Sequence, residues 1–183
     1  MKVLIVVDMQ NDFITGPLGT SEARAIVPKV CDLIGQDYDE VCYTMDTHDV
    51  FYLDTPEGKK LPIEHCIYDT RGWDLNYDVW SAIMKRNCKT IGNHTTVEQI
   101  KVDSFGNTAL GTMYKGVAET TGVSFDICGV CTDICVISNA LLLKTYYPFS
   151  DIKVIASACA GTTPEMHQKA LDVMGSCQIE VVE

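Results

Sequence analysis

Short apolar stretches rich in valine and isoleucine recur along the chain. Turn residues follow each of them, and then a longer stretch with helical spacing. Most of the short stretches are apolar throughout instead of alternating, which is typical of strands covered on both faces. They predict six strands, at residues 2–7, 40–45, 98–101, 124–128, 151–156 and 177–182. The longer stretches predict five helices, at residues 21–35, 74–85, 107–115, 132–146 and 164–175.

The alternation of strands and helices predicts the fold class. Strand–helix–strand units form parallel sheets with helices on both faces, so we expect a three-layer α/β/α Rossmann-like fold with a mainly parallel six-stranded sheet. The chain is 183 residues long, and we interpret residues 1–183 as one domain. In such sheets ligands bind at the carboxyl ends of the strands, so the chemistry is expected there.

One segment, residues 46–73, lacks the alternation. It has little periodicity, and it contains the turn-forming residues Pro56, Gly58 and Pro62 and two of the four histidines of the chain. A connection of this length inside a compact domain is usually functional or disordered.

Composition narrows the classes of partner and compartment. The net charge of −11 and the absence of a Lys/Arg cluster argue against a nucleic-acid partner. No apolar run approaches a membrane span of about 18 residues, so no membrane partner is expected. The first apolar run closes at Asp8 after five residues, and we find no signal peptide. The nine cysteines are therefore expected to stay reduced in the cytoplasm.

Three predicted strand ends carry side chains that could take part in catalysis. Asp8 follows the first strand, Lys101 ends the third, and a segment with Cys131 and Cys135 follows the fourth. Taken singly, Asp8 could cap a turn and Lys101 could be a surface lysine. Together they place a carboxylate, an ammonium group and a thiol at one edge of the sheet, which suits nucleophilic catalysis. Cys135 falls near a helix start, where we expect the pKa of its thiol to be lowered.

The irregular segment offers a second constellation. Asp46 and His48 form an Asp-x-His pair, and His65 follows seventeen residues later. Asp-x-His places two ligands on one side of an extended segment, and a loop histidine can complete a three-ligand metal site with open positions. The alternative is that both histidines are loop residues satisfied by hydrogen bonds.

These motifs resemble the cysteine hydrolases of the isochorismatase-like superfamily. Asp8 stands in Asp-Met-Gln-Asn-Asp-Phe, Lys101 precedes Ser-Phe-Gly-Asn-Thr, and Cys135 stands in Gly-Val-Cys-Thr-Asp-Ile-Cys-Val. The motifs occur in the family's order, and the resemblance covers essentially the whole chain. It implies that Cys135 is the nucleophile, Lys101 stabilises its thiolate and Asp8 transfers protons. It also implies a cis peptide bond between Val130 and Cys131.

The nicotinamidase branch of that superfamily supplies the expected substrate and cofactor. Asp46, His48 and His65 fall on positions that bind a divalent metal in that branch, with zinc expected first and iron or manganese as alternatives. Phe13 and Phe105 are the candidate aromatic walls for a flat substrate ring. We predict the backbone N–H groups of Cys131 and Cys135 as the oxyanion hole.

The resemblance thus implies a metal-dependent amidohydrolase converting nicotinamide to nicotinate and ammonia. A homo-oligomer, dimer or tetramer, is the expected assembly.

Three other interpretations remain. The first is hydrolysis of another small amide or carbamoyl compound with the same triad, for which relatives generally use arginine and no metal. The second is a thiol-relay protein built on Cys128, Cys131 and Cys135, which leaves Asp8 and Lys101 without a role. The third is a metal-binding module without catalysis. The remaining seven cysteines are interpreted as small buried hydrophobic residues, namely Cys31, Cys42, Cys66, Cys88, Cys128, Cys159 and Cys177.

Overall fold

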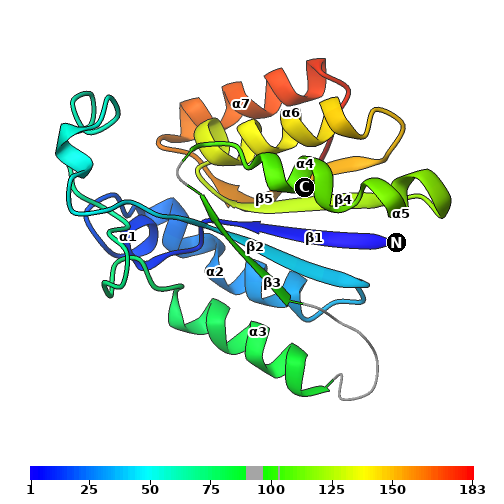
Figure 1. Ribbon diagram of the computed structural model, residues 1–183, viewed down its shortest axis with the longest axis horizontal. Helices are drawn as coiled ribbons and strands as arrows, with labels where there is room; N and C mark the ends of the chain where they lie inside the picture. The colour runs from blue at the N-terminus through cyan, green and yellow to red at the C-terminus, as the bar shows by residue number, and fades with distance from the viewer. Residues whose placement is uncertain (90–96, 103) are drawn as a thin grey trace.

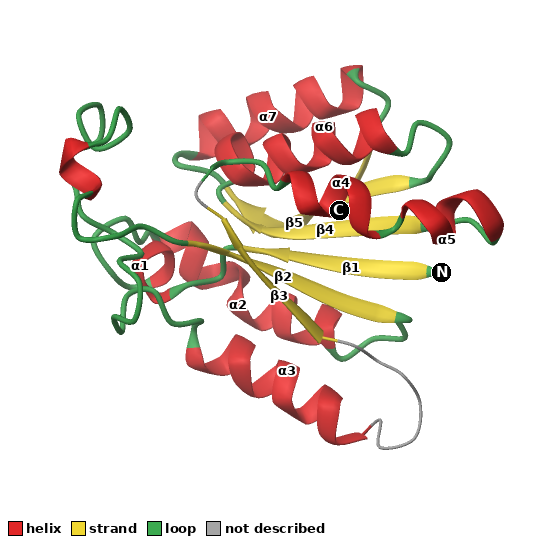
Figure 2. Ribbon diagram, viewed as in Figure 1, coloured by secondary structure: helices red, strands yellow, loops and turns green. Residues whose placement is uncertain are grey.

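A computed structural model describes residues 1–89, 97–102 and 104–183, with side chains described for residues 1–86 and 104–183. It confirms the predicted fold class: one parallel sheet with helices on both faces (Figures 1 and 2). The strands of this sheet are β1 (Lys2–Val7), β2 (Glu40–Asp46), β3 (Val97–Val102), β4 (Ser124–Val130), β5 (Ile152–Ala160) and β6 (Glu180–Val182).

The strand order is β3-β2-β1-β4-β5-β6, and every neighbouring pair is parallel. The order reverses direction between β1 and β4, the two central strands. In open α/β sheets the crevice at this reversal, outside the carboxyl ends of the strands, is the usual place for a ligand. The architecture therefore points to the ends of β1 and β4.

Helices cover the sheet on both faces. The longer helices are α2 (Ser21–Ile34), α3 (Tyr77–Lys89), α6 (Ile137–Tyr146) and α7 (Pro164–Ser176). Figure 2 shows α2 and α3 against one face of the sheet, with α6 and α7 against the other. Short helical segments complete the described part of the chain: α1 (Asn11–Ile14), η1 (Tyr52–Asp54), α4 (Thr108–Met113), α5 (Lys115–Thr120) and the π-helical turn η2 (Thr132–Val136).

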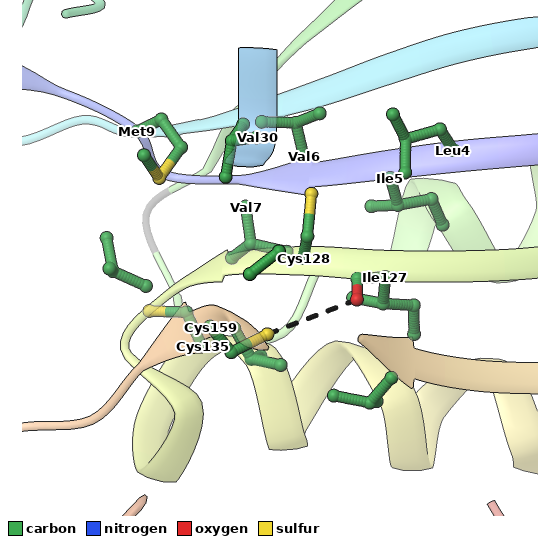
Figure 3. Close-up of a cluster of buried hydrophobic side chains, with 14 of the residues drawn as sticks. Leu4, Ile5, Val6, Val7, Met9, Val30, Ile127, Cys128, Cys135 and Cys159 are labelled. Carbon is green, nitrogen blue, oxygen red and sulfur yellow. Dashed lines mark hydrogen bonds between the residues drawn. The ribbon is translucent and has the colours of Figure 1, made fainter. Parts of the chain in front are cut away.

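The core lies between the sheet and its helices. Figure 3 shows apolar side chains of β1 and β4 packed together, with Val30 of α2 on one side and Cys159 on the other. The five residues of β1 after Lys2 are completely buried. Burial on both faces explains why this strand is apolar throughout.

Gly129 lets β4 pass close to β1. Its φ is +121°, and a Cβ atom there would lie 2.1 Å from the carbonyl oxygen of Val7. The register of β4 with β5 also shifts between Ile127 and Gly129, as at a β-bulge. The end of β4 is thereby turned toward the end of β1, where Asp8 follows.

Four predicted elements were wrong in extent. The helix expected at residues 74–85 is α3, Tyr77–Lys89, and the strand expected at residues 151–156 is β5, Ile152–Ala160. The helix expected at residues 107–115 ends at Met113, and a second helix, α5, begins at Lys115. The strand expected from residue 177 begins only at Glu180, because Cys177 still caps α7 and Gln178 has a left-handed φ of 63°. The turns at Tyr114 and Gln178 interrupt apolar patterns, and the nearest glycines, Gly116 and Gly175, lie inside helices and do not mark them.

The interpretation of the surplus cysteines was partly wrong. Cys42, Cys66, Cys128 and Cys159 are buried, as expected, but Cys31 is only partly buried and Cys177 is exposed. The side chain of Cys88 lies outside the described residues. Cys177 lies at the end of α7, a position that the apolar pattern alone does not distinguish from a strand.

Candidate active site

Asp8 and Cys135 meet at the carboxyl edge of the two central strands. Asp8 directly follows β1 and is almost completely buried, with a left-handed φ of 48°. Cys135 lies in η2, the turn that leads from β4 into α6, and its thiol is hydrogen-bonded to the Asp8 carboxyl. The structure therefore brings together two of the three predicted catalytic side chains, although 127 positions separate them in sequence.

Burial makes Asp8 a weaker acid than usual. Desolvation raises the pKa of Asp8 to about 7, against a lowering contribution from its hydrogen bond with Thr44. The Thr44 hydroxyl donates this bond to Asp8 Oδ1 over 2.6 Å. A carboxyl group that titrates near neutrality can both accept and return a proton, as general acid–base catalysis requires.

The electrostatic expectation for Cys135 was wrong. Burial raises its pKa well above the usual value, and the nearby Asp8 charge raises it further. The start of a helix favours a thiolate, but here the loss of water and the adjacent carboxylate outweigh that effect. Considering the described groups alone, burial and Asp8 favour the thiol form of Cys135.

Cys131 differs from Cys135 in its position and partners. It is the N-cap residue of η2, and the peptide bond between Val130 and Cys131 is cis, as the resemblance implied. Burial raises the pKa of the Cys131 thiol to about 12. Only the thiol of Cys135 is hydrogen-bonded to Asp8 among these two cysteines.

Lys101 lies on β3, where its backbone pairs with Met45 of β2 in the parallel register. Its side chain lies outside the described residues, so its predicted contact with Cys135 stays a prediction. The register places residue 101 one position before Val102, the partner of Asp46, and hence at the same edge of the sheet as Asp8.

Asp46, His48 and His65 form a compact cluster beside this pair. One potential ligand atom from each lies within 4.8 Å of the others. Asp46 Oδ2 is 3.1 Å from His48 Nε2 and 3.3 Å from His65 Nε2. The cluster joins the end of β2 to a loop, because His48 forms a parallel bridge with Ile67, two residues after His65.

The hydrogen bonds of this cluster fit a divalent metal. His65 Nδ1 lies 2.8 Å from the carbonyl oxygen of Ile63, which as acceptor holds the proton on Nδ1 and leaves Nε2 as a ligand. His48 Nε2 is buried and has no hydrogen-bond partner within the described part of the chain. An orphaned buried nitrogen, a second imidazole and a carboxylate are a suitable donor set for zinc or a related metal.

The pKa values of the cluster reflect the same closeness. Burial opposes the charged form of Asp46, but the closeness of the His48 and His65 imidazoles outweighs it and lowers the pKa of the carboxyl. Burial likewise lowers the pKa of His65, yet the Asp46 hydrogen bond and the Ile63 carbonyl raise it overall. A bound cation would compete with a proton for His65 Nε2, so metal binding there is expected to depend on pH.

Glu57 is a site residue that sequence reasoning did not choose. Its Oε1 lies 4.0 Å from His48 Nε2, and it lines the same cavity as Asp46 and His65. The only available signal was proximity in sequence to two histidines, which many solvated acidic residues share. Only the folded structure brings Glu57 close to His48 and into the lining of the cavity.

A cavity of about 740 Å³ connects the two clusters. It is mostly apolar, and Cys135 and Cys131 line one side while Asp46 and His65 line another. Phe13 and Phe105, the predicted aromatic walls, both border it. Phe13 is 8% exposed and its ring lies edge-on to His65 with 5.5 Å between centroids, whereas Phe105 is 50% exposed.

Asn139 links Cys135 to Phe105, one of these predicted walls, and sequence reasoning did not identify Asn139. Its Nδ2 donates to the carbonyl oxygen of Cys135 over 2.8 Å and to that of Phe105 over 3.3 Å. Its Oδ1 accepts the N–H of Asn107. The available signal was a polar residue inside an apolar helical stretch.

Comparisons with known proteins agree with this geometry. The Isochorismatase domain matches residues 2–183. A nicotinamidase of Schizosaccharomyces pombe is 28% identical over 212 aligned residues, which cover 98% of this chain and 91% of that protein.

Two solved structures are similar over the whole chain. The nicotinamidase/pyrazinamidase of Bacillus subtilis has a TM-score of 0.78 at 26% identity, and the alignment covers 100% of this chain and 99% of that one. A pyrazinamidase of Pyrococcus horikoshii in complex with zinc has a TM-score of 0.72 at 25% identity, with 100% and 98% covered.

Within the described residues, none of the helices combines the length and the apolar character that a bilayer crossing requires.

Proposed function

Because the chain belongs to the isochorismatase family, we propose that it hydrolyses the carboxamide of nicotinamide to nicotinate and ammonia, through a thioester on Cys135. One observation carries the proposal. Cys135, whose thiol is hydrogen-bonded to the buried Asp8 carboxyl, lines the same cavity as Asp46 and His65 of the candidate metal cluster. The cavity therefore offers a nucleophile, a proton carrier and an anchor for a ring nitrogen.

The first half-reaction forms the thioester. Asp8 takes the proton of the Cys135 thiol as the sulfur attacks the carboxamide carbon, and a carbon–sulfur bond forms. The protonated Asp8 then gives its proton to the amide nitrogen, the carbon–nitrogen bond breaks and ammonia leaves. The pKa of Asp8, raised by burial to about 7, suits a group that must do both.

The second half-reaction returns the enzyme to its starting state. Asp8 takes a proton from water as the oxygen attacks the thioester carbon, the carbon–sulfur bond breaks and the sulfur recovers the proton. In both half-reactions negative charge develops on the carbonyl oxygen, and the N–H groups of Cys131 and Cys135 are our proposed donors to it. Lys101 is our proposed cation beside the sulfur.

The proposed role of the metal cluster is to orient the ring of the substrate. Asp46, His48 and His65 would hold a divalent cation, which when bound supplies a Lewis acid for a ring nitrogen or a water molecule. Phe13, packed against His65, would cover one face of the ring, and Phe105 would border the opposite side of the cavity. The resulting specificity is for flat, uncharged amides.

The charged residues that line the cavity favour an uncharged carboxamide over the alternative substrates, which are acidic amides or carbamoyl compounds. Hydrolases of acidic amides or carbamoyl compounds are expected to use arginine, and no arginine is among the described residues that line the cavity. Lys60 is the cation among these lining residues, and it is exposed and accompanied by Glu57. An uncharged amide fits this balance better than an anion.

The test is ammonia release by the purified chain. We expect turnover of nicotinamide, and a bound divalent metal in elemental analysis, with Cys135→Ala as the inactive control. Turnover of maleamate or an N-carbamoyl amino acid without turnover of nicotinamide would favour the alternative. The proposed dimer or tetramer is checked on the same preparation by light scattering.

A further inference from the structure

Asp12 has no role in the chemistry described above, although it shares a motif with Asp8 and Phe13. It lies in α1, the short helix after β1. Its Oδ2 accepts a hydrogen bond from the backbone N–H of Cys66 over 2.8 Å, across 54 positions of sequence. Cys66 directly follows His65, so this bond fixes the loop that carries one of the three candidate ligands.

The peptide groups of Cys66 connect Asp12 to a second ligand as well. The carbonyl oxygen of Cys66 accepts the backbone N–H of His48 over 3.0 Å. Cys66 is completely buried and has a left-handed φ of 46°. One residue is thus held by Asp12 on its N–H side and by His48 on its carbonyl side, and its orientation determines how the two histidine segments face each other.

The third ligand is held by the same turn. Gln10 is completely buried, and its Nε2 donates to the carbonyl oxygen of Asp46 over 2.8 Å and to that of Trp73 over 2.8 Å. Residues 10–12 therefore contact the backbone of all three ligand segments, directly or through Cys66. None of these contacts involves the ligand atoms themselves.

Two glycines leave room for the Asp12 carboxylate. A Cβ atom on Gly72 would lie 2.2 Å from Asp12 Oδ2, and one on Gly16 would lie 2.5 Å from Asp12 Oδ1. A side chain at either position would therefore displace the carboxylate from the Cys66 N–H. The close packing of Gly16 and Gly72 against Asp12 therefore restricts the position of its carboxylate.

We propose that Asp12 is a positioning residue for the divalent metal site, holding the His65–Cys66 segment at the distance from His48 and Asp46 that coordination requires. The proposal rests on the metal site of the proposed function. Residues that orient metal ligands typically change metal affinity by about 10–100-fold when they are removed, without touching the metal. Asp12 is expected to act in the same range.

The experiment measures zinc affinity by competition with a chromophoric chelator, using Zn²⁺ alone as the probe. We expect Asp12→Ala to weaken binding by about 10–100-fold. Asp12→Asn keeps an acceptor oxygen and should recover most of that loss. Gly72→Ala leaves Asp12 in the sequence but displaces its carboxylate, and should match Asp12→Ala. Asp172→Asn, on the exposed face of α7, is the matched control and should bind as the unaltered chain does.

A second readout reports coordination geometry instead of affinity. Co²⁺ in place of Zn²⁺ gives an absorption spectrum that depends on ligand number and arrangement. Asp12→Ala and Gly72→Ala should change this spectrum, whereas Asp172→Asn should not. Circular dichroism identifies any variant that fails to fold, and Asp12→Asn and Gly72→Ala then decide the question without Asp12→Ala.

The outcomes separate this inference from the proposed function. Zinc affinity and cobalt spectra of Asp12→Ala and Gly72→Ala that match the unaltered chain would overturn the inference, even if nicotinamide is hydrolysed. Failure of the unaltered chain to bind zinc would overturn it as well. Weakened zinc binding in both variants would support it even if the chain released no ammonia from nicotinamide, in which case only the proposed substrate would fail.

Discussion

The two halves of the candidate site are held in place in different ways. Asp8 directly follows β1, and Cys135 lies in η2, the short turn after β4; the ladder between β1 and β4 is continuous from Lys2 to Val7. His48 and His65 lie in an irregular segment that Figure 1 shows projecting beyond the carboxyl edge of the sheet. That segment is fixed to the sheet by side-chain contacts such as those of Asp12 and Gln10.

The difference indicates how sensitive each part of the site is to substitutions elsewhere in the chain. Repeated backbone pairing and a buried core fix the strand ends, so a single substitution elsewhere shifts them little. A metal cluster held by a few hydrogen bonds depends on each of them. We therefore expect chemistry at Cys135 and metal binding at His48 to be separable by mutation, and five predictions test this separation.

The largest expected effect concerns Cys135 itself. Cys135→Ala removes the nucleophile and should lower kcat/KM for nicotinamide by at least about 10³-fold, the scale seen when a covalent catalyst is lost. Zinc affinity should stay within about twofold, because Cys135 belongs to the strand-end half. A parallel loss of zinc binding would show that the two halves are one cooperative unit.

His48→Ala attacks the other half. It should abolish stoichiometric metal binding and lower kcat/KM by about 100-fold or more through lost orientation of the ring. The rate at which iodoacetamide alkylates Cys135 should change little. A fully active, metal-free His48→Ala enzyme would contradict the proposed metal site and favour the alternative amide or carbamoyl substrate.

Metal binding should stabilise the irregular segment against local opening more than it stabilises the central strands. A ligand that binds only the folded arrangement stabilises the segments it joins. Adding saturating Zn²⁺ is therefore expected to slow amide hydrogen exchange in residues 46–70 by about tenfold or more, and to leave β1 and β4 nearly unchanged. Uniform slowing across the sheet would contradict the comparison.

The pH dependence tests the strand-end half more finely. The pKa of Asp8, raised to about 7, means that the carboxylate needed as a base forms as pH rises through about 7, so kcat/KM should fall on the acid side of that value. Thr44 lowers this pKa by its hydrogen bond, so Thr44→Val should move the acid limb to higher pH. The pH–rate profiles of the unaltered chain and of Thr44→Val measure the shift. An acid limb at the same pH in both would mean that a group other than Asp8 causes the limb.

The smallest effect is expected at Cys131. Its thiol is not hydrogen-bonded to Asp8 in the described structure, and its proposed contribution is a backbone N–H that alanine retains. Cys131→Ala should keep a substantial part of the activity, within about tenfold of the unaltered chain. Losses equal to those of Cys135→Ala in steady-state ammonia release would overturn the assignment of the nucleophile.

Much of the fold was predictable because its signals are local. The bounds of β1 were predicted correctly, and α7 was predicted within one residue; the structure starts this helix with a capping bond to Thr163 and with Pro164 in its first turn. Two of the errors in extent lie at turns within an apolar pattern, at Tyr114 and at Gln178. Such turns depend on packing against distant elements, which a pattern in one segment does not record.

The candidate site was predictable in identity but only partly in chemistry. The strand-end rule singled out Asp8 and Cys135, and the Asp-x-His pair singled out Asp46 and His48. The pKa of Cys135 was predicted in the wrong direction, because its burial and its contact with Asp8 arise from residues remote in sequence. Thr44 and Asn139 were missed, and Glu57 was not chosen, for the same reason.

The sequence by itself determined the alternation of strands and helices, the family motifs and the types of residue available for chemistry. These depend on local periodicity and on side-chain identity, which are written along the chain. Only the tertiary structure decided that a carboxyl and a thiol are hydrogen-bonded, that three candidate ligands converge within 4.8 Å, and that Asp12 reaches the loop of His65. Distances between remote residues and the water around them follow from packing, and packing exists only in the folded chain.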